Sequence, residues 1–156
     1  MLFIVDAMLG NVARKLRLLG FDSTYFSDID DSDLLKKAKN ENRIIISKDN
    51  QLIQQTKKNK IPSIHISKED EIEQFLEILK IIPLKLDVIS GDTARCPKCN
   101  SETSKISKQN LQNQISQEIL EFHDKFWKCN GCDQIYWEGT HIKNLQDFVE
   151  KINSSI

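Results

Sequence analysis

The sequence lacks the features that mark several large classes of protein. Its formal net charge is only -1 at pH 7, so the overall composition gives no argument for a polyanionic partner. It has no run of roughly 18 apolar residues that could span a bilayer, and we expect no membrane contact. The first residues, MLFIVDAML, lack the basic region that opens a secretory signal, and we therefore expect a cytoplasmic protein.

Residues 1–88 alternate between short apolar runs and amphipathic stretches. Four runs have the length and composition of strands: 2–5, 23–26, 43–46 and 63–66. Apolar residues at helical spacing predict four helices between and after them. The first ends near Gly20, the second begins after the cap candidates Asp31 and Ser32, and the fourth stops before Pro83. This order predicts a three-layer α/β domain, in which helices cover a parallel sheet.

Residues 89–156 differ in composition and predict a second, smaller domain. They contain all four cysteines and stretches rich in Gln, Ser and Asn. The segments FWKC and IYW predict two strands, Ile115 and Ile119 with Leu120 predict a short helix, and NLQDFVEKI predicts a last amphipathic helix.

The cysteines form two C-x2-C pairs, Cys96 with Cys99 and Cys129 with Cys132. Two such knuckles complete the tetrahedral sulfur shell that Zn²⁺ prefers. Disulfides are disfavoured in a cytosolic protein, and a redox C-x-x-C motif does not need a second copy. Because four protein ligands leave no open position, we expect a structural zinc.

Aspartates stand where two predicted strands end. Asp6 comes after residues 2–5, and Asp49 comes after residues 43–46. The carboxyl ends of parallel strands share one edge, so these acids and the group 30–33 should gather there. Close carboxylates favour Mg²⁺ or Mn²⁺, which can activate water and clamp a phosphate. The alternative is that Asp6 and Asp49 only cap the next helices, and spacing alone does not decide between the two.

Other enzymes built on a parallel sheet lack their signatures here. No Gly-rich loop ends in Lys-Ser/Thr, and no G-x-G-x-x-G comes after a predicted strand. Met8 occupies the position where a haloacid dehalogenase phosphatase has its second aspartate. A response-regulator receiver domain needs acids where Ile4 and Val5 stand.

Several motifs, in this order, resemble one known family. VDAMLGNVARKLRLLGFD, DDSDLLKKA and RIIISKD closely resemble the PIN-like RNase family named after the C-terminal domain of the mutator-seven protein. CPKC, CNGC and YWEGTH are similar to the zinc ribbon usually appended to that domain. The resemblance covers nearly the whole chain. It implies a PIN-like nuclease domain over residues 1–88 and a zinc ribbon with a C-terminal helix over residues 89–156.

The resemblance also implies roles for individual residues. The acids expected to bind Mg²⁺ or Mn²⁺ and to serve catalysis are Asp6, Asp31 and Asp49, with Asp30 and Asp33 as alternatives to Asp31. The resemblance implies that Arg14, Arg17 and Lys48 contact substrate. Trp137 and His141 are added as candidates because their rings could stack on bases. Trp137 and His141 stack on unpaired bases in this interpretation, whereas packing in the ribbon core is the alternative.

The leading hypothesis is a metal-dependent endoribonuclease whose zinc ribbon positions the RNA. Two departures from the family pattern support a non-catalytic RNA- or ribosome-binding factor as the alternative. Asn11 and Lys15 replace the more usual arginine and tryptophan, and Ser47-Lys48 replaces Thr-Arg, which loses the bidentate fork of arginine. A zinc ribbon on a PIN-like nuclease is similar to archaeal rRNA-processing endonucleases, a fold-level analogy that suggests rRNA as substrate beside tRNA.

Overall fold

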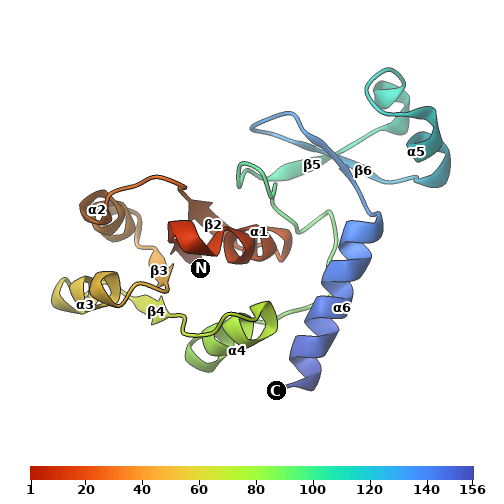
Figure 1. The fold of residues 1–156 in the computed structure, drawn as a ribbon. Coiled ribbons are helices and arrows are strands. Elements are labelled where there is room, and N and C mark those ends of the chain that lie inside the picture. Colours follow the sequence, from red (N-terminus) through yellow and green to blue (C-terminus); the bar gives the residue numbers. More distant parts are fainter.

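The chain folds into a parallel sheet flanked by helices and a smaller antiparallel sheet (Figure 1). A computed structural model describes all residues, 1–156. None of its helices combines the length and the apolar character needed to cross a bilayer.

The first sheet has four parallel strands in the order β2-β1-β3-β4. Its strands are β1 (Leu2–Val5), β2 (Asp22–Tyr25), β3 (Ile44–Ser47) and β4 (Ser63–His65). The predicted parallel sheet is therefore confirmed, and every predicted strand end lies within one residue of the observed one.

Helices connect the parallel strands. They are α1 (Gly10–Leu18), α2 (Asp31–Glu41), α3 (Asn50–Lys58) and α4 (Glu71–Ile81), and a 3-10 turn, η1 (Ala7–Leu9), precedes α1. The predicted cap of the second helix is wrong by one residue, because Asp31 already has helical geometry and Asp30 is the N-cap. Gly20 ends the first helix as predicted. Its φ of +91° favours glycine, and a Cβ there would lie 2.9 Å from the carbonyl oxygen of Thr93.

The two faces of the parallel sheet carry separate hydrophobic clusters. Phe3 and Val5 of β1 belong to a cluster of 16 buried residues that includes side chains of α1 and α4. Ile4, which points to the opposite face because strand side chains alternate, belongs to a cluster of 6 with side chains of α2 and α3. Helices therefore pack on both faces of this sheet.

The second sheet is antiparallel, with the order β5-β6-β7. Its strands are β5 (Thr103–Ile106), β6 (Phe126–Cys129) and β7 (Ile135–Trp137), and β5 leads through the 3-10 turn η2 (Lys108–Leu111) to α5 (Gln117–Phe122). The sequence predicted β6, β7 and α5. It did not predict β5, whose residues TSKI are mostly polar and half-exposed or exposed. We call residues 95–137 the ribbon unit.

The last helix, α6 (Thr140–Ser154), leaves the ribbon unit and packs against the first sheet's helices (Figure 1). Leu145, Val149 and Ile152 belong to the cluster of 16 buried residues. Phe148 meets the ring of Phe75 in α4 edge to face, with 5.2 Å between ring centroids. We call β1–β4, α1–α4 and α6 the sheet unit. The predicted domain boundary between residues 88 and 89 stays a prediction. It separates the two sheets, but α6 comes after it in the chain and packs in the core of the first sheet.

Candidate functional site

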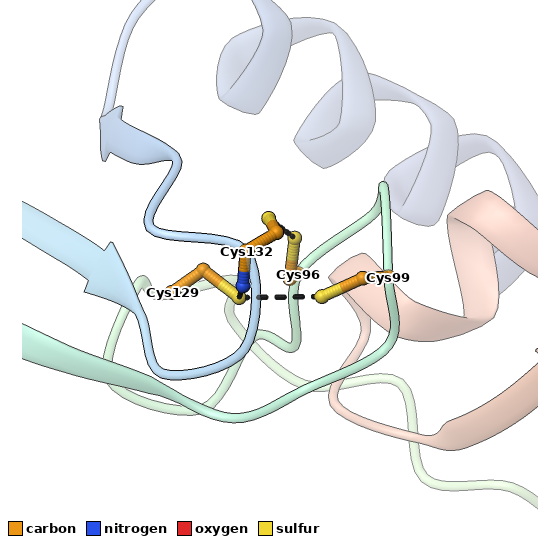
Figure 2. A group of neighbouring side chains, drawn as sticks. All are labelled: Cys96, Cys99, Cys129 and Cys132. Atoms are coloured by element: carbon orange, nitrogen blue, oxygen red, sulfur yellow. Dashed lines mark hydrogen bonds between the residues drawn. The ribbon is translucent and has the colours of Figure 1, made fainter.

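The four cysteines converge between two loops, and Figure 2 shows their sulfur atoms facing one another. All four sulfurs lie within 4.8 Å of one another, and none forms a disulfide. Cys96 Sγ lies 3.7 Å from Cys132 Sγ, and Cys99 Sγ lies 3.3 Å from Cys129 Sγ. A tetrahedral zinc with bonds of about 2.3 Å places its sulfurs about 3.8 Å apart. This group could therefore hold a zinc ion, as the sequence predicted.

The thiols lie in opposed electrostatic environments. A hydrogen bond from Ser101 is the main influence that lowers the pKa of Cys99, to about 6. Burial raises the pKa of Cys129 to about 12, although the backbone N–H groups of Cys132 and Gly131 donate to its sulfur. Thiols this close therefore do not all ionise readily in the metal-free protein. A cation bound among them favours the thiolate form of each, and its binding releases protons.

Tyr136 belongs to the surroundings of the cysteines. Its hydroxyl oxygen lies 2.9 Å from Cys96 Sγ. Burial, then the nearby Cys96, raises the pKa of Tyr136, so the hydroxyl keeps its proton at neutral pH. It can then donate a hydrogen bond to the Cys96 thiolate, which is the role expected of a group packed around a metal centre.

Arg17 connects the first cysteine knuckle to the sheet unit. Its side chain is buried, Nε donates to the carbonyl oxygen of Ser23 at 2.7 Å, and Nη1 donates to that of Pro97 at 2.8 Å. Burial lowers the pKa of Arg17. The sequence predicted a contact with substrate phosphate, whereas the structure turns this guanidinium toward backbone oxygens, including a longer bond from Nη1 to the Lys98 carbonyl.

Asn100 forms a second connection to the sheet unit, which sequence reasoning missed. Its Oδ1 accepts from the backbone N–H of Ser23 at 2.9 Å, and its Nδ2 donates to Asp22 Oδ1 at 2.8 Å. Asp22 also pairs with Arg43 at 2.6 Å and with Arg95 at 3.5 Å. Because β2 is an edge strand, these contacts cover polar groups that the sheet itself leaves unpaired.

Asp6 and Asp49 lie at the carboxyl ends of adjacent strands, β1 and β3, and each caps the helical segment that begins after it. Asp6 accepts from the backbone N–H of Ala7 through Oδ1 at 2.7 Å. Asp49 accepts from the N–H of Gln51 through Oδ1 at 2.8 Å. The predicted capping role is thus confirmed for both aspartates. Capping does not use all the acceptor positions of either side chain, because a carboxylate offers about four lone pairs.

Ser47 links these two acids. It is fully buried at the end of β3, its hydroxyl donates to Asp6 Oδ2 at 2.7 Å, and its oxygen accepts from the backbone N–H of Asp49 at 2.9 Å. Sequence reasoning missed this role. The signal that could have found it is the hydroxyl itself, because serine keeps the hydroxyl of the threonine in the family's Thr-Arg-Asp triplet.

Asp31 faces the same acids across the sheet edge. Burial, then the charges of Asp49, Asp6 and Asp30, raises the pKa of Asp31. Asp31 is half-buried, whereas Asp30 and Asp33 are exposed. The structure therefore brings Asp31 into the electrostatic field of Asp6 and Asp49. Their ligand atoms do not all meet within 4.8 Å, a condition that only the four cysteines satisfy in this chain.

The predicted basic contacts are divided between two places. Lys48 directly precedes Asp49 in the chain, and its Nζ forms an ion pair with Glu69 at 2.5 Å. Arg14 is exposed on α1 without an ion pair and lines a cavity of about 720 Å³. Trp137 and His141 line that same cavity, which opens between α1, the ribbon unit and the start of α6. Three residues predicted from two separate motifs, the first helix and YWEGTH, thus share one cavity.

One comparison with known proteins gives a match. The family model described as Mut7-C RNAse domain matches residues 1–149 of the chain. Neither a curated protein nor a solved structure matches the sequence significantly. The family match includes the sheet unit almost completely and the whole ribbon unit, so the cysteines and the acids both lie within it.

Proposed function

This chain belongs to the Mut7-C RNAse domain family, and from that premise we propose that it is a metal-dependent endoribonuclease with a PIN-like sheet unit and a structural zinc ribbon. The family match supports a nuclease-like role with RNA as substrate. The observation that supports the finer proposal is the position of Asp6 and Asp49 at the carboxyl ends of the adjacent strands β1 and β3, where Ser47 hydrogen-bonds to both. Asp31 lies near enough for the charges of both acids to raise its pKa.

The donors at this edge fit Mg²⁺ or Mn²⁺, which prefer carboxylate oxygens and retain several waters. Asp6 accepts two hydrogen bonds, and Asp49 uses only Oδ1 for its cap bonds, so both keep free acceptor positions. Ligands bridged by retained waters also need not approach one another closely. When bound, such an ion supplies an activated water and neutralises charge on the phosphate.

The chain's own residues prepare this site in distinct ways. Ser47 is a positioning residue, because its hydroxyl fixes both the carboxylate of Asp6 and the backbone of Asp49. Lys48, next to Asp49 in the chain, is the cation proposed to contact a substrate phosphate, which would displace its partner Glu69, a side chain 88% exposed. Arg14 gives a second cation, on α1. Arg17, in contrast, holds the cysteine knuckle in place.

A non-catalytic RNA-binding factor is the second candidate, and a specific observation favours it. Asp6 and Asp49 both act as helix caps, and the acidic oxygens do not form a group within 4.8 Å. A degenerate site would keep these aspartates for capping alone. In that case the protein would bind RNA, with rRNA, tRNA or a ribosome as the proposed partner, without cutting it.

The test is cleavage of a labelled single-stranded RNA by the wild-type protein and by Asp6→Asn, with and without added Mn²⁺. Withholding Mn²⁺ is preferable to adding a chelator, because a chelator also competes for zinc at the cysteines. We expect cleavage only by the wild type with Mn²⁺, with a loss of at least about 100-fold in Asp6→Asn, as for removal of a group that stabilises transition-state charge.

Asp28→Asn is the matched control, since Asp28 is an exposed acid in the loop before α2. Full activity in Asp28→Asn would show that loss of an arbitrary surface charge is harmless. Cleavage by Asp6→Asn at the wild-type rate would contradict the proposed metal site. RNA binding without cleavage in every sample would support the second candidate instead.

A further inference from the structure

We propose that the junction between α1, α6 and the ribbon unit is a groove that binds single-stranded RNA, with one base stacked on Trp137 and the adjoining phosphate held by Arg14 and the N-terminus of α6. This inference deepens the proposed function, since it assumes that RNA is the substrate. It assigns the substrate a path that reaches the acids from the ribbon unit.

Two cavities make up this groove. The cavity of about 720 Å³ lies against the ribbon unit, and a neighbouring cavity of about 490 Å³ lies between α1, α4 and α6. Arg14, Leu18 and His141 line both, so the two cavities adjoin at these residues. The junction of these elements is visible in Figure 1. Together the cavities are larger than a single small ligand needs and suit an extended chain.

The free charge in the larger cavity of the groove is positive. The smaller cavity adds the pair Lys15–Glu71 and one further charge of each sign, Asp147 and Lys151. Arg14 and Lys98 line the larger cavity and have no ion-pair partner, whereas Arg95 already pairs with Asp22 and Glu102. Glu138 is the one acid of that cavity, and its carboxylate accepts from the backbone N–H of Gly91 at 3.3 Å. Two unpaired cations on the walls favour an anionic chain such as a phosphodiester backbone.

The N-terminus of α6 adds donors to the same place. Gly139, Thr140 and His141 all line the larger cavity, and the N-cap Gly139 offers no side-chain cap. The backbone N–H groups of Thr140 and His141 donate no hydrogen bond within the protein. Unpaired N–H groups and the positive end of a helix dipole are suited to a phosphate. Arg14 lines the same cavity, and the proposal has one phosphate contact both Arg14 and these N–H groups.

The aromatic wall of the groove comes from the ribbon unit. Trp137 is half-buried at the end of β7, where it lies near Phe126 with 6.4 Å between ring centroids and still lines the cavity. Gly139 leaves room beside this ring, because a Cβ at that position would lie 3.2 Å from Trp137 Nε1. A flat, partly exposed indole held on a rigid strand is a platform on which an unpaired base can stack.

The smaller cavity leads from this platform toward the acidic edge. It runs along α1 from Leu18 and Arg14 to Asn11, near the start of the helix that comes after Asp6. The helical rise makes this distance about 10 Å, which is long enough to hold more than one nucleotide. An RNA strand in the groove would thus be held by the ribbon unit at one end and offered to the acids at the other.

Tryptophan fluorescence tests the proposal without requiring cleavage. The chain has two tryptophans. Trp127 also lines the larger cavity, but it is only 2% exposed and its indole N–H bonds to Asp92, so a stacked base would contact Trp137. Titration of the full zinc-bound protein with a short oligouridine, in a buffer without Mg²⁺ or Mn²⁺, should quench the emission of Trp137. Trp137→Phe should keep most of the affinity but lose the quenching. Trp137→Leu should bind about 5- to 150-fold more weakly, the range for loss of one base stack.

The salt dependence tests the phosphate contact. The logarithm of the affinity falls linearly with the logarithm of the salt concentration. Arg14→Gln should make this slope less steep by about 0.7, the value for one phosphate contact with a single strand. Lys39→Gln is the matched control, because Lys39 is an exposed cation on α2, outside the groove. Phe122→Leu is the matched control for Trp137→Leu, because it removes an aromatic residue that is 75% exposed on α5.

The outcomes separate the groove from the proposed enzyme. Quenching that Trp137→Phe lacks, together with the reduced slope in Arg14→Gln, supports the groove whether or not cleavage occurs. A second outcome would overturn the groove and leave the proposed nuclease intact. In it, Asp6→Asn loses the Mn²⁺-dependent cleavage, whereas Trp137→Leu and Arg14→Gln cleave at the wild-type rate. Absence of quenching in the wild type at oligouridine concentrations that saturate binding overturns the groove as well.

Discussion

The sheet unit and the ribbon unit differ in how much apolar surface each can bury. The parallel sheet lies between clusters of 16 and 6 buried hydrophobic residues, whereas the ribbon unit has a cluster of only 4. Burying one side chain of Val, Leu, Ile or Phe contributes about 1.5–3 kcal/mol, so the smaller cluster cannot offset the chain entropy of its unit. The ribbon unit instead contains the four cysteines. A zinc ion held by them would supply free energy that packing does not.

The two units are nevertheless not independent bodies. Arg17 of α1 donates to carbonyl oxygens of the first cysteine knuckle, and Asn100 of that knuckle hydrogen-bonds to the edge strand β2. The last helix then leaves the ribbon unit to complete the larger core. The ribbon unit is thus connected to the sheet unit on two sides, through α1 and β2 and through α6.

Cys129→Ser should produce the largest effect, because it removes one of the four sulfur ligands. Structural zinc contributes about 10–16 kcal/mol in small zinc-binding peptides, far more than the ribbon unit's core. We expect loss of hydrogen-exchange protection in β5, β6 and β7, with β1 and β3 still protected, and loss of bound zinc in the same sample.

Ser104→Ala is the control for this variant, since the exposed Ser104 hydroxyl only donates to the side chain of Asn130, at 3.0 Å. It should keep both zinc and protection. A ribbon unit that stays protected in Cys129→Ser after zinc is lost would show that its small core suffices, and the contrast between the two units would fail.

Ile152→Ala tests whether α6 belongs to the sheet unit. Ile152 is fully buried in the cluster of 16, so its truncation should lower the free energy of unfolding of the sheet unit by about 2–5 kcal/mol. The control, Ile156→Ala, changes the same residue type at 82% exposure and should leave stability unchanged. Denaturant unfolding monitored by circular dichroism at the helical bands gives both values. Equal stabilities would mean that α6 does not share this core.

Asp22→Asn tests the polar connection and should have the smallest effect. Burial raises the pKa of Asp22, but the hydrogen bonds from Arg43 and Asn100 outweigh it, so the pKa lies below its ordinary value. A lowered carboxyl pKa contributes stability above about pH 3.9, its unfolded value, and this is lost as the pH falls through the folded value. We expect a cost of about 1–2 kcal/mol at pH 7, because the side chain is 23% exposed and partly screened.

The difference in stability between wild type and Asp22→Asn should therefore narrow as the pH is lowered below about 4. Protonation of the cysteines at low pH affects both proteins alike and cancels in the difference. Asp28→Asn, at an exposed acid, is the control for the loss of one surface charge. A difference between wild type and Asp22→Asn that does not vary with pH would show that the connection depends on shape rather than on the Asp22 charge.

The sequence predicted local features well wherever short-range physics decides them. The four parallel strands agree with short apolar runs, and the cysteine cluster agrees with two C-x2-C pairs that each need only one tight turn. The sequence left open whether Asp6 and Asp49 cap helices or bind a metal ion. The structure gives both acids cap bonds, and their catalytic role stays a prediction.

The sequence could not show which side chains face each other across the fold. Arg14 and Arg17 lie in one basic motif, yet one lines a cavity and the other is buried against the knuckle. Residues three apart lie on neighbouring parts of a helix surface, so the elements packed against α1 decide which of the two is covered. In the sequence, Ser47 appeared only as a replacement for the family's threonine. Its hydrogen bonds to Asp6, just after β1, and to Asp49, just before α3, appear only in the folded structure.

The amino-acid sequence was enough to establish the α/β order of the first unit, the cysteine pairs and the family to which the chain belongs, because each depends on patterns within a few residues. The folded structure was needed to show that α6 returns to the larger core, that Asn100 covers the edge of β2, and that Arg14, Trp137 and His141 share one cavity. These contacts join residues far apart in the chain. Their free energy comes from burial and hydrogen bonding after folding, which no local pattern specifies.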